Sequence, residues 1–95
     1  MKKYELQDYV DKLNNRYCKS SKNKFEIEQA YGRNYSVVLT GKRNKNGKPV
    51  KGSLGTGQVC VGNDWHDSVE NTLKALYRAD YRGWIKDAVK YSNKK

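Results

Sequence analysis

The residues with the clearest chemical potential are six cations in a stretch that has no carboxylate. Between Glu28 and Asp64 the chain runs 35 residues without an acidic side chain. Cations without neutralising partners suit a polyanion, because each lysine or arginine that meets a phosphate releases condensed counterions. The alternative is a solvated loop that keeps the protein soluble. The six cations are Arg33, Lys42, Arg43, Lys45, Lys48 and Lys51.

Five of these cations surround the dipeptide Asn46-Gly47, which is a strong hairpin signal. A type I′ turn requires positive φ at both central positions, and Asn-Gly is the pair that adopts it most readily. Pro49 lies just past the turn, where an edge strand tolerates it. The stretch 40–54 therefore predicts a cationic β-hairpin with a two-residue turn at Asn46-Gly47.

A second set of basic residues recurs every four positions near the end of the chain. At 3.6 residues per turn, such positions form a slowly winding ridge on one helix. The alternative is an ordinary polar helix face on which Glu70 and Lys74 form an i,i+4 pair. The ridge comprises Lys74, Arg78, Arg82, Lys86 and Lys90, and its first three members join the hairpin cations as candidate nucleic-acid contacts. A third cluster without acids contains Lys12, Arg16, Lys19, Lys22 and Lys24.

Aromatic residues near loops offer either base stacking or a protein contact. Tyr31 and Tyr35 flank a turn beside Arg33, and Trp65 and His66 lie in a loop before the last helix. For each aromatic residue, packing in the core or at its edge is the alternative. In the rival hypothesis of a protein-binding protein, the candidate contacts are Trp65, His66, Tyr31 and Tyr35.

The sequence offers little for catalysis, a cofactor or a metal ion. His66 is the only histidine, and no Ser or Cys stands at a spacing typical of a nucleophile–base pair. Cys18 and Cys60 have no CxxC or CxxH spacing, which favours free thiols over a zinc site. We therefore expect a protein that is not an enzyme and that has no cofactor, metal or small-molecule substrate.

The composition is typical of one small basic domain. The chain has 95 residues, 20 Lys+Arg against 10 Asp+Glu and a net charge of +10, with a mean hydropathy of −1.08. This balance favours DNA, RNA or an acidic protein surface as the partner. No apolar run approaches the ~18–20 residues of a membrane-spanning helix, and no signal peptide is recognisable. We expect a cytoplasmic protein that does not contact membranes.

Hydrophobic periodicity predicts the elements that position these residues. Gly83 interrupts the last helical pattern, which indicates one bent helix or two joined helices. Asp67 and Glu70 indicate a variant capping box at its start. The expected elements are a helix over 3–17, strands over 25–31, 35–40 and 52–61, and a helical segment over 69–91.

These elements predict an α+β fold in a single domain over 1–95, ordered over about 3–91 with a frayed tail at 92–95. Both helices cover one face of a three-stranded antiparallel sheet. The predicted core consists of Leu6, Tyr9, Val10, Leu13, Phe25, Ile27, Val37, Leu39, Val59, Val61, Val69, Leu73, Leu76, Trp84 and Ile85.

The expected order of helix, three strands and helix resembles the double-stranded-RNA-binding domain over about residues 3–82. That family opens its second helix with a lysine-rich motif that grips phosphates, whereas residues 64–70 here read Asp-Trp-His-Asp-Ser-Val-Glu. Residues 35–80 also resemble the arm-binding domains of phage integrases, in which a basic hairpin enters the DNA major groove. The second resemblance implies DNA contacts from Lys42, Arg43, Lys45, Lys48 and Lys51.

Residues 1–10 and 71–77 are similar in texture to small early-region proteins of phages and prophages of low-GC Gram-positive bacteria. That resemblance implies a phage-type accessory or regulatory protein. The leading hypothesis is a non-catalytic nucleic-acid-binding protein that contacts phosphates through the hairpin and the ridge. The rival hypothesis is an inhibitor or antirepressor that binds a host or mobile-element protein, such as a repressor, replication or defence factor.

Overall fold

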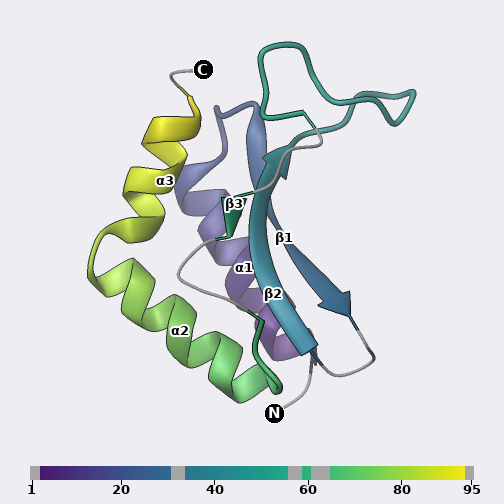
Figure 1. The fold of residues 1–95 in the computed structure, drawn as a ribbon. Helices are drawn as coiled ribbons and strands as arrows, with labels where there is room; N and C mark the ends of the chain where they lie inside the picture. Colours follow the sequence, from purple (N-terminus) through teal and green to yellow (C-terminus); the bar gives the residue numbers. More distant parts are fainter. Residues whose placement is uncertain (1–2, 31–33, 56–58, 61–64, 94–95) are drawn as a thin grey trace.

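The computed structural model describes residues 3–30, 34–55, 59–60 and 65–93. Figure 1 shows a sheet with the helices gathered on one side of it. In chain order the elements are α1 (Lys3–Tyr17), β1 (Asn23–Ala30), β2 (Asn34–Gly41), β3 (Val59–Cys60), α2 (Val69–Tyr81) and α3 (Trp84–Ser92).

The predicted chain order of one helix, a three-stranded sheet and a second helix is wrong, although the α+β class holds. The described chain has three helices, and its sheet is in essence the two-stranded antiparallel ladder of β1 and β2. β3 adds only two residue pairs to β2, the last of them between Cys60 and Val38. The next described pair joins His66 to Tyr35. Between these two pairs β2 moves by three residues, from Val38 to Tyr35, whereas the partner segment moves by six, from Cys60 to His66. The two pairs are therefore not in one register.

One face of the β1–β2 ladder forms the floor of the core. Phe25 lies opposite Leu39, and Ile27 lies opposite Val37. Because side chains alternate between the two faces of a strand, these four share one face. They pack against the apolar sides of the helices. The buried cluster comprises Leu6, Val10, Leu13, Cys18, Phe25, Val37, Leu39, Val69, Leu73, Leu76, Ala79, Ile85 and Val89.

Ten of the fifteen predicted core residues are in this cluster. Tyr9 and Ile27 are only partly buried and pack at its margin. Trp84 is 46% exposed, so its assignment to the core is wrong. Val61 and the side chain of Val59 lie outside the described residues. The other predicted core residues are buried.

The last helical segment consists of two helices. Gly83 has φ 80°, a left-handed conformation that costs glycine little, and it separates α2 from α3. The cap of α2 is Ser68, whose hydroxyl accepts from the backbone N–H of Asn71. The prediction that Asp67 caps this helix is therefore wrong. Asp67 instead accepts a hydrogen bond from the side-chain amide of Asn71.

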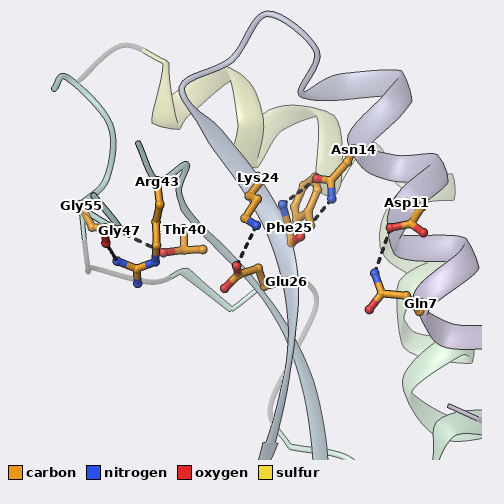
Figure 2. Close-up of polar contacts among 10 residues, drawn as sticks. All are labelled: Gln7, Asp11, Asn14, Lys24, Phe25, Glu26, Thr40, Arg43, Gly47 and Gly55. Carbon is orange, nitrogen blue, oxygen red and sulfur yellow. Dashed lines mark hydrogen bonds and ion pairs between the residues drawn. The ribbon is translucent and has the colours of Figure 1, made fainter. Parts of the chain in front are cut away.

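Side-chain amides and carboxylates join the helices to the sheet and to one another. Asn14 of α1 donates to the carbonyl of Phe25 (3.0 Å) and accepts from its N–H (2.7 Å), as Figure 2 shows. Between α1 and α2, the Asp80 carboxylate accepts from the Tyr9 and Tyr17 hydroxyls, both at 2.9 Å. It also pairs with Arg16 at 3.1 Å. These contacts join α1 to β1 on one side and to α2 on the other.

The environment of Tyr9 predicts a specific loss of stability in alkali. Burial, together with the hydrogen bond to Asp80, raises the pKa of Tyr9 above its usual range. A tyrosine in the unfolded chain releases its proton near pH 10. Above that pH unfolding therefore releases a proton, and the free energy of unfolding falls as pH rises. Below that pH the contribution of Tyr9 is complete.

A comparison of the protein with its Tyr9→Phe variant isolates this effect. At neutral pH we expect the variant to be less stable by about 1–2 kcal/mol, because it lacks a hydrogen bond to a charged group. Urea unfolding at about pH 8 and about pH 11 should show that the difference shrinks at the higher pH. A difference that stays constant or grows would contradict the assigned role of Tyr9.

Candidate nucleic-acid interface

The basic hairpin, defined as residues 42–50, is a two-stranded projection at the end of β2 (Figure 1). The N–H of Val50 donates to the carbonyl of Lys42, and the N–H of Asn44 donates to the carbonyl of Lys48, each at 2.8 Å. Arg43 and Pro49 face each other as a bridge. The projection points away from the helices.

The turn of the hairpin differs from the predicted type I′ turn. The N–H of Gly47 donates to the carbonyl of Asn44 at 3.0 Å, so the central residues are one position earlier than expected. Gly47 follows them with φ 76°, which is typical of a three-residue hairpin loop. The Asn44 side-chain oxygen accepts from the N–H groups of Asn46 (2.9 Å) and Lys48 (3.1 Å). The hairpin was predicted from the sequence, but the hydrogen bonds of the Asn44 side chain within the turn were not.

The cations of the tip are open to solvent. Residues 43–48 and Lys51 are exposed. Three ion pairs form among the described residues, and none includes a hairpin cation. They are Arg16 with Asp80, Lys24 with Glu26 and Lys74 with Glu70. Arg43 donates to the carbonyl of Gly47 at 3.1 Å, which holds its guanidinium beside the turn (Figure 2). The hairpin thus presents positive charge in a defined shape.

Lys42 has a different role from the other hairpin cations. It is half-buried, and its ammonium donates to the carbonyl of Cys18 at 2.7 Å, just past the end of α1. Its backbone N–H donates to the carbonyl of Lys22 at 2.8 Å. A cation at a helix C-terminus is stabilised by the partial negative charge there. Lys42 is therefore an anchor of the hairpin.

The base of the hairpin adjoins a cation from the third sequence cluster. Lys22 lies beside Gly52, and together with Ser20 and Asn93 they line a hollow of about 340 Å³. The sequence pattern assigned Lys22 to a cluster separate from the hairpin, because Lys22 lies 20 positions before Lys42. The pairing of β1 with β2 brings the two segments together.

A buried amide holds the segment after the hairpin. Asn23 is 1% exposed, and its side-chain oxygen accepts from the N–H of Leu54 at 2.8 Å. Its amide donates to the hydroxyl of Ser92 at 3.2 Å. Thr40 and the N–H of Gly41 reach the carbonyl of Gly55. No pattern in the sequence distinguishes Asn23 from the many exposed asparagines.

The ridge cations of α2 do not join the hairpin. Lys74 is paired with Glu70 at 3.5 Å, and the guanidinium of Arg82 lies 5.5 Å from the centre of the Trp84 ring. Arg78 is exposed on the same helix. Figure 1 shows α2 and the hairpin at opposite sides of the molecule. The α2 cations and the hairpin therefore form separate basic surfaces. Arg33 lies outside the described residues.

The candidate protein-binding residues are partly fixed by the sheet. Tyr35 and His66 exchange two backbone hydrogen bonds of 2.7 and 2.8 Å, and both side chains are half-buried. Trp65 is 45% exposed beside them. Tyr31 lies outside the described residues. The backbone pairing of Tyr35 with His66 therefore joins the segment just before α2 to strand β2.

The described residues offer few groups for nucleophilic or metal chemistry. Cys18 is a free, buried thiol, and burial raises its pKa to about 11 although Lys42 opposes the shift. Within the described ranges, no group of three His, Cys, Asp or Glu side chains could hold a metal ion. None of the described helices is long and apolar enough to cross a membrane.

Comparison with protein-family models, with curated proteins and with solved structures finds no match for this chain.

Proposed function

We propose that this protein is a non-catalytic nucleic-acid-binding protein that contacts phosphates through the basic hairpin and Lys51. The observation that carries the proposal is a projecting ribbon with exposed cations that have no ion-pair partner among the described residues. Phosphates can bind there without breaking an existing ion pair, and they release counterions when they do. Lys22 extends the same surface at the base.

The shape of the hairpin favours duplex DNA over duplex RNA. A two-stranded β-ribbon is one of the elements that the major groove of B-DNA admits. The major groove of A-form RNA is too deep and narrow for side chains to enter. The proposal therefore includes a preference for DNA when the two duplexes have the same sequence.

The chemistry of the hairpin favours contacts to the backbone over base recognition. Lysine contributes a point charge that suits phosphates, whereas bases are read by the planar groups of Arg, Asn and Gln. The amide oxygen of Asn44 is already used within the turn, and the guanidinium of Arg43 is held by Gly47. Binding should thus depend weakly on sequence.

Salt dependence tests the proposal directly. Five cations, Lys22, Arg43, Lys45, Lys48 and Lys51, are available to phosphates. With ~4–6 phosphate contacts, the slope of log K against log salt should be about −4 to −5. Fluorescence anisotropy with a labelled DNA duplex, and with the RNA duplex of equal sequence, measures both slope and preference. No binding at low salt, or an affinity that ignores salt, would refute the proposal.

The thiol of Cys18 supports the non-catalytic part of the proposal. A raised pKa keeps this group protonated at neutral pH, and the protonated thiol is a poor nucleophile. Its burial also separates it from any bound nucleic acid. Cys18 acts as a small apolar residue of the core.

A further inference from the structure

Three large aromatic side chains are exposed around the junction of α2 and α3. Tyr77 is 50% exposed, Tyr81 is 91% exposed and Trp84 is 46% exposed. Aromatic residues usually contribute their large apolar area to the core. Here the core is formed by other residues of the same helices. The exposure of these rings on neighbouring turns calls for a ligand that contacts aromatic surfaces.

Two of the three rings, those of Tyr77 and Trp84, are held by contacts within the molecule. Tyr77 makes an edge-to-face contact with Tyr9, with ring centres 4.8 Å apart and planes at 86°. Tyr81 lies one turn further, about 6 Å along the helix axis. Gly83 then redirects the chain, and Trp84 carries the Arg82 guanidinium over its ring. We name Tyr77, Tyr81, Arg82 and Trp84 the aromatic belt.

The charges around the aromatic belt favour an anionic ligand. The carboxylate of Glu70 is paired with Lys74, and that of Asp80 is held by Arg16 and two tyrosines. The exposed acids of α2 and α3 are Glu70, which is paired, and Asp87. The exposed cations of the two helices and of the link between them are Lys74, Arg78, Arg82, Lys86 and Lys90. Rings interleaved with cations are the pattern that binds single-stranded nucleic acid, because bases stack on the rings and cations attract the phosphates.

We infer that the aromatic belt is a base-stacking platform for single-stranded nucleic acid. The inference rests on the proposed nucleic-acid-binding function and adds a second site with its own substrate class. The hairpin sequence contains no aromatic residue, so it grips phosphates without stacking on bases. The belt lies on the far side of the molecule from the hairpin (Figure 1), so a strand on one site leaves the other uncovered.

The experiment compares single-stranded and duplex DNA on matched variants. Tyr81→Ala removes the most exposed ring, and Tyr4→Ala is the control because Tyr4 is a 60% exposed tyrosine of α1. We expect Tyr81→Ala to weaken binding of oligothymidylate by about tenfold. Its affinity for duplex DNA should stay unchanged. Tyr4→Ala should change neither affinity.

A spectroscopic reading locates the bases. The chain has two tryptophans, so in a Trp65→Phe background the tryptophan emission comes from Trp84 alone. Stacking of thymine bases on this ring should quench its emission in a saturable way. The hairpin variant Lys45→Glu/Lys48→Glu should retain the quenching while its affinity for duplex DNA falls.

The outcomes separate the two proposals. Equal loss of oligothymidylate affinity in both tyrosine variants, or no loss in Tyr81→Ala, overturns the platform while duplex binding still supports the hairpin. Absence of quenching, or quenching by an acidic peptide and not by oligothymidylate, also overturns it, the latter in favour of a protein contact. If neither DNA form binds at low salt, the proposed function fails as well.

Discussion

Exchange of Lys45 and Lys48 for glutamate is expected to weaken duplex DNA binding by about 100-fold. Each lysine loses a charge-assisted contact to phosphate, of ~1.5–3 kcal/mol at most, and each glutamate adds repulsion. Both residues are exposed at the tip, and neither side chain supports the turn. The slope of log K against log salt should become shallower by about two. Anisotropy titrations over a range of salt concentrations measure both effects.

Lys12→Glu/Lys19→Glu is the matched control, because both residues are exposed and the net charge changes equally. If binding reflects only the net charge of the protein, both variants lose the same affinity, and the hairpin has no special role. Lys42 is left unchanged in this test. Its ammonium is bonded to the carbonyl of Cys18, so a change there would confuse binding with folding.

Asn23→Ala is expected to lower the free energy of unfolding by about 2–4 kcal/mol. The substitution leaves the N–H of Leu54 without its acceptor and the hydroxyl of Ser92 without its donor. Each buried polar group left unpaired costs about 1–3 kcal/mol. The lost amide also leaves a small cavity. Urea unfolding followed by circular dichroism measures the change.

Asn15→Ala provides the comparison, because Asn15 is exposed on α1 and its loss should alter stability by less than about 0.5 kcal/mol. Similar stability of the two variants would show that the Asn23 amide has no structural role. Because Asn23 holds Leu54, its loss should also loosen the segment behind the hairpin. Faster amide exchange at Gly41 and Val50 would reveal that effect.

The sequence predicted well those features that depend on local pattern. The helix over 3–17 matches α1, because an unbroken apolar periodicity fixes which face is buried. The existence of the hairpin was predicted from the turn residues around Gly47. The type of its turn was not predicted, because the Asn44 side chain accepts hydrogen bonds from N–H groups of the loop in place of backbone carbonyls.

The errors arise where distant parts of the chain decide the outcome. Counting at helical period through Gly83 places Trp84 in line with Leu73, but the left-handed glycine resets the phase and turns Trp84 outward. Among the described residues the third strand pairs with β2 only at Val59 and Cys60, and the next described pair, His66 with Tyr35, is in a different register. The roles of Asn23 and Asp80 depend on partners that only the folded chain brings near.

The polar contacts between the first and last parts of the chain bear on how the protein folds during synthesis. Tyr9 bonds to Asp80, and Asn23 bonds to Ser92, across 71 and 69 residues of sequence. Helix α1 and strand β1 leave the ribosome long before these partners exist. Contacts so distant in sequence make folding slow, since a long loop must close before they form. We expect the domain to become protease-resistant only after α3 has emerged.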